Sequence, residues 1–177
     1  MKTVVDVAII VGSRSDLKVI KESVEILKKF DLSYTLNIAS AHRTAQHLRQ
    51  CIQNAENSGV KVFIAAAGMA AALPGVIASE TVLPVIGVPV ASGNFSSLDS
   101  LFSIVQMPKG VPVATLAVGK TGAVNAAILA VQIIAVSDKS LKEKLKMYRD
   151  KMSKDVVKDD LDLQEKGIEN YLEELKN

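Results

Sequence analysis

Five consecutive residues combine a proton-transfer group, a fixed positive charge and two hydroxyls: Ser40-Ala41-His42-Arg43-Thr44. Imidazole side chains exchange protons near neutral pH, so His42 can act as a general acid or base. The Arg43 guanidinium beside the Ser40 hydroxyl suits an anion, and phosphate above all. A surface histidine and an arginine that only begin a helix would look the same. These five residues alone leave both interpretations open.

Residues 40–44 lie where an extended segment gives way to a helical one. Alternating apolar residues predict a strand over 33–38, and Leu48, Ile52 and Ala55 at helical spacing predict a helix from about residue 44 to just before Gly59. Open parallel α/β sheets bind their ligands where the carboxyl ends of strands lead into helices. This junction is therefore a position suited to a binding site.

The remaining pattern predicts an α/β fold. Further strands are expected at 4–11, 60–66, 85–90 and 113–118, with helices at about 17–30, 99–105 and 122–135. Alternating strands and helices predict a doubly wound parallel sheet in a three-layer αβα sandwich, with flavodoxin-like strand order 2-1-3-4-5. We expect a single α/β domain over 1–153, followed by a charged helix or tail over 154–177.

In that strand order, the loops after the first three strands (12–16, 40–44 and 67–75) converge on one crevice. Asp16 can accept hydrogen bonds from ribose hydroxyls, and the serines of these loops can join Arg43 in holding a phosphate. Small residues in the third loop either let backbone N–H groups approach a ligand or let a helix pack tightly on the sheet. The predicted site comprises His42 as the catalytic group, with Ser13, Ser15, Asp16, Ser40, Arg43 and Gly68 as binding residues.

Several other site classes are disfavoured. Gly119-Lys120-Thr121 resembles the end of a phosphate-binding P-loop, but Ala114 stands where that motif needs a glycine. The turn after the first strand lacks the dinucleotide fingerprint. His42 and His47 have no neighbouring cysteine or acidic cluster, so no metal site is expected. We therefore expect a ribonucleotide-binding acid–base site with no metal and no organic cofactor.

The amino-acid composition limits the binding partners and the cellular compartment that we expect for this protein. Net charge is +2 with dispersed lysines, which does not suggest nucleic-acid binding, and no apolar run predicts a membrane span. The single Cys51 and the lack of a leader pattern predict a reduced, cytoplasmic protein. The segment 122–135 is apolar nearly all round, which predicts a helix buried partly between subunits of a homo-oligomer.

Several motifs together resemble the N5-carboxyaminoimidazole ribonucleotide mutases of purine biosynthesis (the PurE family). They are residues 12–16 (Gly-Ser-Arg-Ser-Asp), 40–44, 99–108 (Asp-Ser-Leu-Phe-Ser-Ile-Val-Gln-Met-Pro), 110–113 and 125–127. The resemblance runs from about residue 7 to residue 138. It implies the three-layer sandwich expected above and an octameric assembly.

The resemblance also implies a reaction, the transfer of a carboxylate from N5 to C4 of the aminoimidazole ring of a ribonucleotide. In the family mechanism the substrate is decarboxylated, carbon dioxide is retained in a closed pocket, and the ring is recarboxylated at carbon. The family's catalytic histidine matches His42, and its serine, aspartate and arginine for phosphate and ribose match Ser13, Asp16 and Arg43.

The third loop departs from the family pattern Gly-Gly-Ala-Ala-His-Leu-Pro-Gly. Met69 replaces the second glycine and Ala72 replaces the histidine. Related animal-type carboxylases, which use carbon dioxide directly, carry Ser-Asn in this loop and a lysine after the catalytic histidine, where this chain has Arg43. The sequence therefore favours a mutase and leaves two alternatives, a direct carboxylase and a non-catalytic ribonucleotide-binding oligomer.

Overall fold

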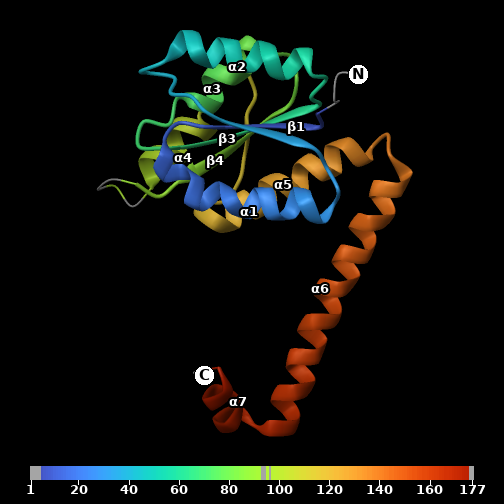
Figure 1. The fold of residues 1–177 in the computed structure, drawn as a ribbon. Coiled ribbons are helices and arrows are strands. Elements are labelled where there is room, and N and C mark those ends of the chain that lie inside the picture. The colour runs from blue at the N-terminus through green and yellow to red at the C-terminus, as the bar shows by residue number, and fades with distance from the viewer. Residues whose placement is uncertain (1–4, 93–94, 96, 176–177) are drawn as a thin grey trace. The chain divides into compact units, whose positions relative to one another are not determined.

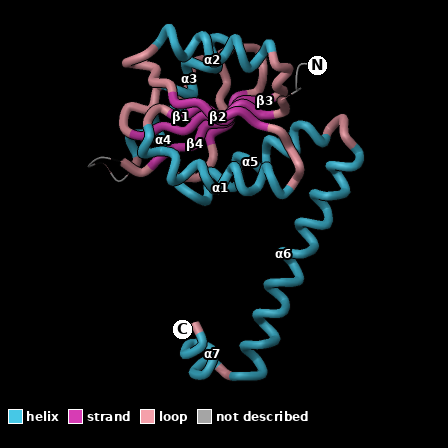
Figure 2. The backbone as a smooth tube through the Cα atoms, viewed as in Figure 1, coloured by secondary structure: helices cyan, strands magenta, loops and turns pink. Residues whose placement is uncertain are grey.

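The computed structural model describes residues 5–92, 95 and 97–175. The chain forms two compact units, Met1–Ile134 and Ala135–Asn177. In the first unit, parallel strands lie between two layers of helices (Figures 1 and 2). This arrangement confirms the predicted three-layer α/β fold.

The sheet contains five parallel strands in the order β2-β1-β3-β4-β5. Their bounds are β1 Val7–Val11, β2 Tyr34–Ile38, β3 Val62–Gly68, β4 Val85–Val90 and β5 Ala114–Thr115. Val11 pairs with Ile38 on one side and with Ala66 on the other, so β1, β2 and β3 end close to one level. The flavodoxin-like order predicted from the sequence is therefore confirmed, and with it the alignment of the strand ends.

The helices of the first unit cover both faces of the sheet. They are the short 3₁₀ helix η1 Arg14–Asp16, α1 Leu17–Lys29, α2 Ala45–Asn57, α3 Leu73–Glu80, α4 Leu98–Val105 and α5 Gly119–Ala135. Figure 1 shows α2 and α3 on one face and α1 and α5 on the other. On the second face, the buried Ser23 hydroxyl of α1 donates to the Ala123 carbonyl of α5 at 2.6 Å.

Aliphatic packing fixes the position of the sheet. All five residues of β1 are buried, as are all six of β4, because each strand has neighbours on both sides and helices on both faces. Phe63 of β3 is fully buried in a cluster that includes Ile52 of α2, Ile77 of α3 and Ile104 of α4. The strands that carry the central loops of the site are thus held rigidly.

Asp6 precedes β1 and holds the amino-terminal end of the sheet together. Its carboxylate accepts hydrogen bonds from the Ser33 amide at 3.0 Å, the Ser33 hydroxyl at 2.7 Å and the Lys61 ammonium at 2.9 Å. Burial alone would raise the pKa of Asp6, but these partners outweigh it and lower that pKa below its ordinary value. Asp6 therefore has a structural role at the end of the sheet opposite the predicted site.

Some predicted boundaries are wrong. The fifth strand is two residues long instead of 113–118, although Leu116 N still bonds to the Gly87 carbonyl at 3.0 Å. The third strand runs on to Gly68, and α5 begins three residues early at Gly119. The first strand begins at Val7, and its predicted start at Val4 lies outside the described residues.

The second unit is helical. It contains α6 Lys139–Lys166 and α7 Ile168–Glu174, and α6 runs across residue 154 without a break. Asp138 begins α6, because its carboxylate accepts a hydrogen bond from the Leu141 amide at 3.0 Å. Within the described part of the chain, no helix has the length and apolar character needed to cross a membrane.

Candidate active site

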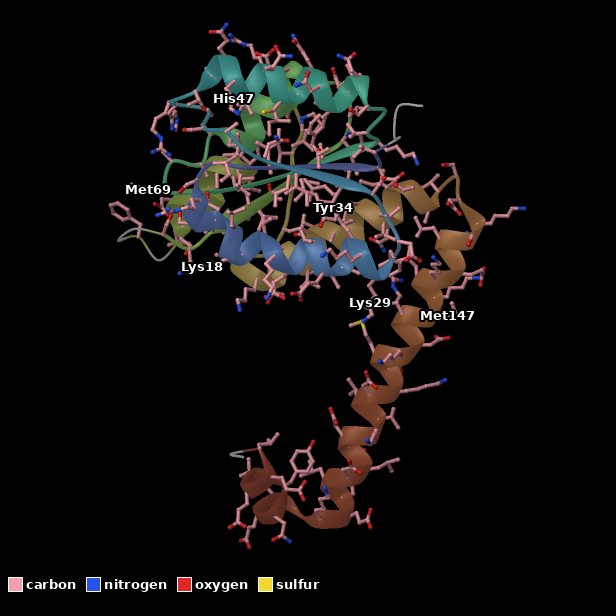
Figure 3. The ribbon with its side chains drawn as sticks, in the orientation of Figure 1. Lys18, Lys29, Tyr34, His47, Met69 and Met147 are labelled. Atoms are coloured by element: carbon pink, nitrogen blue, oxygen red, sulfur yellow. The ribbon has the colours of Figure 1, made fainter. Side chains whose placement is uncertain are left out.

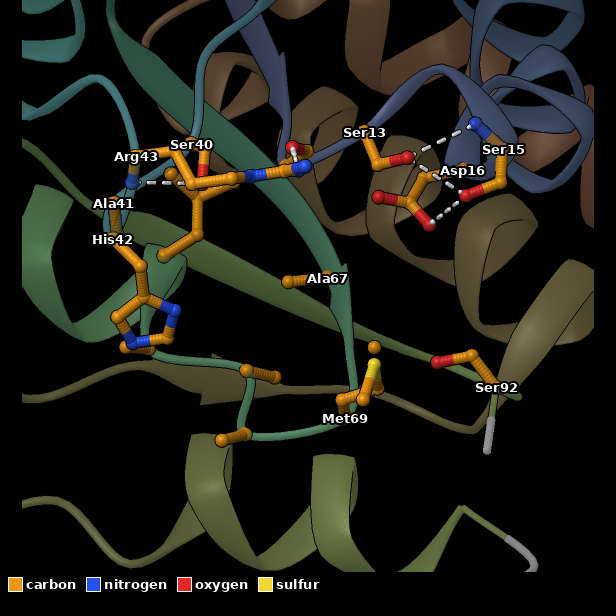
Figure 4. Close-up of a pocket in the computed structure, with 16 residues that line it drawn as sticks. Ser13, Ser15, Asp16, Ser40, Ala41, His42, Arg43, Ala67, Met69 and Ser92 are labelled. Carbon is orange, nitrogen blue, oxygen red and sulfur yellow. Dashed lines mark hydrogen bonds between the residues drawn. The ribbon is translucent and has the colours of Figure 1, made fainter. Parts of the chain in front are cut away.

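A pocket of about 510 Å³ opens at the carboxyl ends of β1, β2, β3 and β4. That volume is within the range that holds small-molecule ligands. The loop after each of these four strands contributes to its wall (Figure 4). The lining residues are Gly12, Ser13, Ser15, Asp16, Ser40, Ala41, His42, Arg43, Ala67, Gly68, Met69, Ala70, Ala71, Ala72, Leu73 and Ser92.

The loop after β2 presents the imidazole and the guanidinium. Thr44 closes this loop on itself, because its hydroxyl accepts from the Ser40 amide at 2.9 Å and donates to the Ser40 carbonyl at 3.1 Å. The Arg43 side chain donates to the Ser40 hydroxyl and to the Gly12 carbonyl, both at 3.4 Å. The His42 side chain is exposed at the pocket wall, where a substrate can reach it.

Arg43 brings an uncompensated positive charge to the pocket. Among the described residues, no carboxylate lies within ion-pair distance of its guanidinium, whose hydrogen-bond partners are neutral oxygens. Its bond to the Gly12 carbonyl also links the loop after β2 to the loop after β1. A guanidinium without an acidic partner is well suited to a phosphate group.

The loop after β1 contributes two hydroxyls and a buried carboxylate. Ser13 begins η1, and its hydroxyl accepts from the Ser15 amide at 3.2 Å and lies 2.9 Å from the Ser15 hydroxyl. Asp16 is only 4% exposed, and its hydrogen bond from the Ser15 hydroxyl is long at 3.4 Å. Burial raises the pKa of Asp16, and the bonds from Ser15 and Ser13 offset this only in part. Hydrogen-bond donors on a ligand would stabilise the charged form of this carboxylate.

The loop after β3 is apolar and tightly turned. Met69 has a left-handed backbone (φ 56°) and a side chain that is 63% exposed, while Ala72 immediately precedes α3. A side chain at Gly68 would overlap the Ser92 hydroxyl and meet the Val90 carbonyl at 3.0 Å. Glycine is therefore required at position 68 by the close approach of the loop after β4.

All seven predicted site residues line this one pocket: Ser13, Ser15, Asp16, Ser40, His42, Arg43 and Gly68. Their assignment to particular chemical roles stays a prediction. His47 does not join them, because it lies on α2, where its Nε2 is 3.6 Å from the Cys51 sulfur (Figure 3). Across the described residues, no three His, Cys, Asp or Glu side chains are grouped so as to hold a metal ion.

Ser92 was not predicted as a site residue from the sequence. It follows β4, whereas the predicted site residues all come from the loops after the first three strands. The sequence signal that points to it is a serine just beyond a buried strand. The carboxyl end of that strand lies at the same end of the sheet as the three predicted loops. In Figure 4 its side chain extends toward the loop that carries Met69.

Comparisons with known proteins agree with this geometry. Residues 6–155 match the model of the AIR carboxylase family. An N5-carboxyaminoimidazole ribonucleotide mutase of Saccharolobus solfataricus is 52% identical over 151 residues, which cover 85% of this chain and 94% of that protein. A mutase of the same name from Pyrococcus abyssi is 50% identical over 167 residues, covering 94% of this chain and 95% of that protein.

A solved structure supports the same relationship. The crystal structure of Treponema denticola PurE superposes with a TM-score of 0.81 at 30% identity, covering 89% of this chain and 97% of that one. The match to the family model extends through all four loops that form the pocket. The chain therefore belongs to the AIR carboxylase family.

Proposed function

We propose that this protein is an N5-carboxyaminoimidazole ribonucleotide mutase, an isomerase of purine biosynthesis that moves a carboxylate from N5 to C4 of the aminoimidazole ring. One observation carries the proposal. In a chain about half identical to mutases so named, a single pocket brings together an imidazole, an unpaired guanidinium and a buried carboxylate. These are the groups needed to move a proton, hold a phosphate and bind a ribose.

The roles follow from position and charge. Arg43, with the Ser40 and Ser13 hydroxyls, holds the phosphate, since Arg43 lacks an acidic partner among the described residues. Asp16, with Ser15 beside it, accepts hydrogen bonds from the ribose hydroxyls. Gly68 lets Ser92 and Val90 lie close to the chain at the end of β3, at the wall of the pocket.

His42 is the proton-transfer group in this mechanism. Decarboxylation at N5 leaves nitrogen to take up a proton, and recarboxylation at C4 requires the carbon to lose one. A single imidazole can serve both steps, because it can donate a proton to N5 and accept the proton that C4 loses. The apolar loop after β3 lines the part of the pocket in which the released carbon dioxide would be held.

The decisive experiment is an assay of the purified protein with each of two substrates. Conversion of N5-carboxyaminoimidazole ribonucleotide without added bicarbonate is the expected result. Turnover only of aminoimidazole ribonucleotide with bicarbonate would identify a direct carboxylase instead, and no turnover of either would identify a binding protein. A direct carboxylase is the second candidate function. Met69 and Ala72 depart from the family pattern in the loop that would retain carbon dioxide.

We also propose that the protein acts as a cytoplasmic homo-oligomer, an octamer by family resemblance. Support comes from α4, where Leu98, Phe102 and Val105 are 53%, 57% and 47% exposed at helical spacing on one face. Ile128 and Leu129 of α5 also stay only half-buried within the single chain. An apolar face of this kind is typical of a subunit contact. Light scattering at micromolar concentration should give a multiple of 18.9 kDa, and a monomer would contradict the proposal.

A further inference from the structure

One buried polar atom of the pocket has no hydrogen-bond partner among the described residues. The Ser92 hydroxyl oxygen is buried, yet it neither donates to nor accepts from any described group. Leaving a buried hydroxyl unpaired costs free energy, so such groups are rare in folded proteins unless a ligand completes them. Ser92 lines the pocket, and a ligand there is the available partner.

The surroundings of Ser92 define which part of a ligand it meets. The neighbouring loop after β3 contributes only Gly, Ala, Met and Leu side chains, so Ser92 is the polar side chain that the described residues place on this side of the pocket. The opposite side already holds Ser13, Asp16, Ser40 and Arg43, which bond with one another or with the backbone. In Figure 4, Met69 lies between His42 and Ser92.

We infer that the Ser92 hydroxyl donates a hydrogen bond to the migrating carboxylate of the substrate and so positions that group beside the ring. This inference rests on the proposed function and adds a positioning residue to it. Arg43 and Asp16 bind phosphate and ribose, which leaves the carboxylate end of the ribonucleotide to the apolar loop and Ser92. A hydroxyl donor with no competing partner suits an anionic oxygen at that position.

The test compares two ligands that differ only by the carboxylate. Dissociation constants of 4-carboxyaminoimidazole ribonucleotide and aminoimidazole ribonucleotide are measured by calorimetry for the wild type and for Ser92→Ala. The variant should bind the carboxylated ligand about tenfold or more weakly, the effect of losing a hydrogen bond to a charged group. It should bind the uncarboxylated ligand within about twofold of the wild type.

Thermal unfolding of the free protein separates this role from a structural one. Because the hydroxyl is unpaired, Ser92→Ala should keep or raise the melting temperature, by about 2–4 °C for each kcal/mol recovered in a chain of this size. Thr35 offers a matched control, since its buried hydroxyl also lacks a partner among the described groups but does not line the pocket. Thr35→Val should leave the affinity for both ligands unchanged.

The outcomes are distinct. Equal weakening of both ligands by Ser92→Ala would overturn the contact with the carboxylate, as would no weakening of either. A lower melting temperature of the free variant would overturn the claim that the hydroxyl is unpaired before a ligand binds. In each of these cases a wild type that still isomerises its substrate leaves the proposed function standing. A wild type that binds neither ribonucleotide overturns both the proposed function and the inference.

Discussion

Replacing Asp16 by Asn tests whether the buried carboxylate is reserved for a ligand. Asn keeps the shape of the side chain and removes its charge, so hydrogen bonds from two ribose hydroxyls become bonds to a neutral oxygen. Bonds to charged groups contribute about 1–1.5 kcal/mol more than neutral ones, so two of them correspond to about 2–3 kcal/mol. Affinity for the ribonucleotide should therefore fall by about 30- to 150-fold.

The same substitution should stabilise the free protein, and the gain should depend on pH. Burial raises the pKa of Asp16 above the 3.8 of an unperturbed carboxyl group. The folded state then holds its proton more tightly than the unfolded state, so this group favours folding most below pH 3.8 and less as pH rises through its folded pKa. Asp16→Asn removes this pH-dependent loss of folding stability. The melting temperature of the variant, relative to that of the wild type, should therefore increase as pH rises toward neutrality.

Calorimetry with 4-carboxyaminoimidazole ribonucleotide and melting curves from acid to neutral pH measure both effects. Asp159→Asn is a suitable control, because it makes the same chemical change at an exposed position of α6. A variant that binds normally would show that Asp16 does not contact the ribose. A melting-temperature difference that is flat with pH would show that the carboxylate is not destabilised by burial.

Three further predictions concern the remaining loops. His42→Asn should preserve ribonucleotide binding and lower kcat by about 10²–10⁴-fold, and near-normal turnover would remove His42 from the chemistry. Arg43→Ala should raise the dissociation constant more than it lowers kcat, whereas a defect confined to kcat would argue against phosphate binding. If the altered third loop retains carbon dioxide poorly, the wild type should release some aminoimidazole ribonucleotide, and Met69→Gly combined with Ala72→His should raise the fraction of complete transfers. An unchanged partition in product analysis would show that this loop does not control retention.

The sequence was sufficient for the fold because its signals are local and repeated. Continuous apolar runs marked β1 and β4, and helical spacing marked α1 and α2, so strand order followed from the class of fold. The length of β5 was overestimated. Apolar residues over 113–118 give the same sequence pattern whether their backbone pairs with a neighbouring strand or their side chains only pack in the core. Helix α3 was not predicted, since the Ala- and Gly-rich stretch before Leu73-Pro74 carries little periodic signal.

The site was predictable to the extent that its residues stand at strand ends. Ser13, Asp16, His42 and Arg43 each follow a recognisable strand, so topology alone brings them together. Ser92 could not be found in this way, because its importance lies in the absence of a partner and in its contact with Gly68. Those properties depend on distances between loops that are far apart in the sequence.

Strand β2, which leads into the loop with His42 and Arg43, lies at the edge of the sheet. Among the described strands, β2 pairs only with β1, and its Leu36 and Ile38 side chains are 39% and 46% exposed, whereas β1 and β3 are paired on both sides. An edge strand with exposed side chains opens at lower free energy than a central one. We therefore expect the loop with His42 and Arg43 to exchange its amide hydrogens sooner than the loops after β1 and β3. If a ribonucleotide bridges Arg43 and Asp16 as proposed, its binding should slow that exchange and make the loop after β2 more rigid.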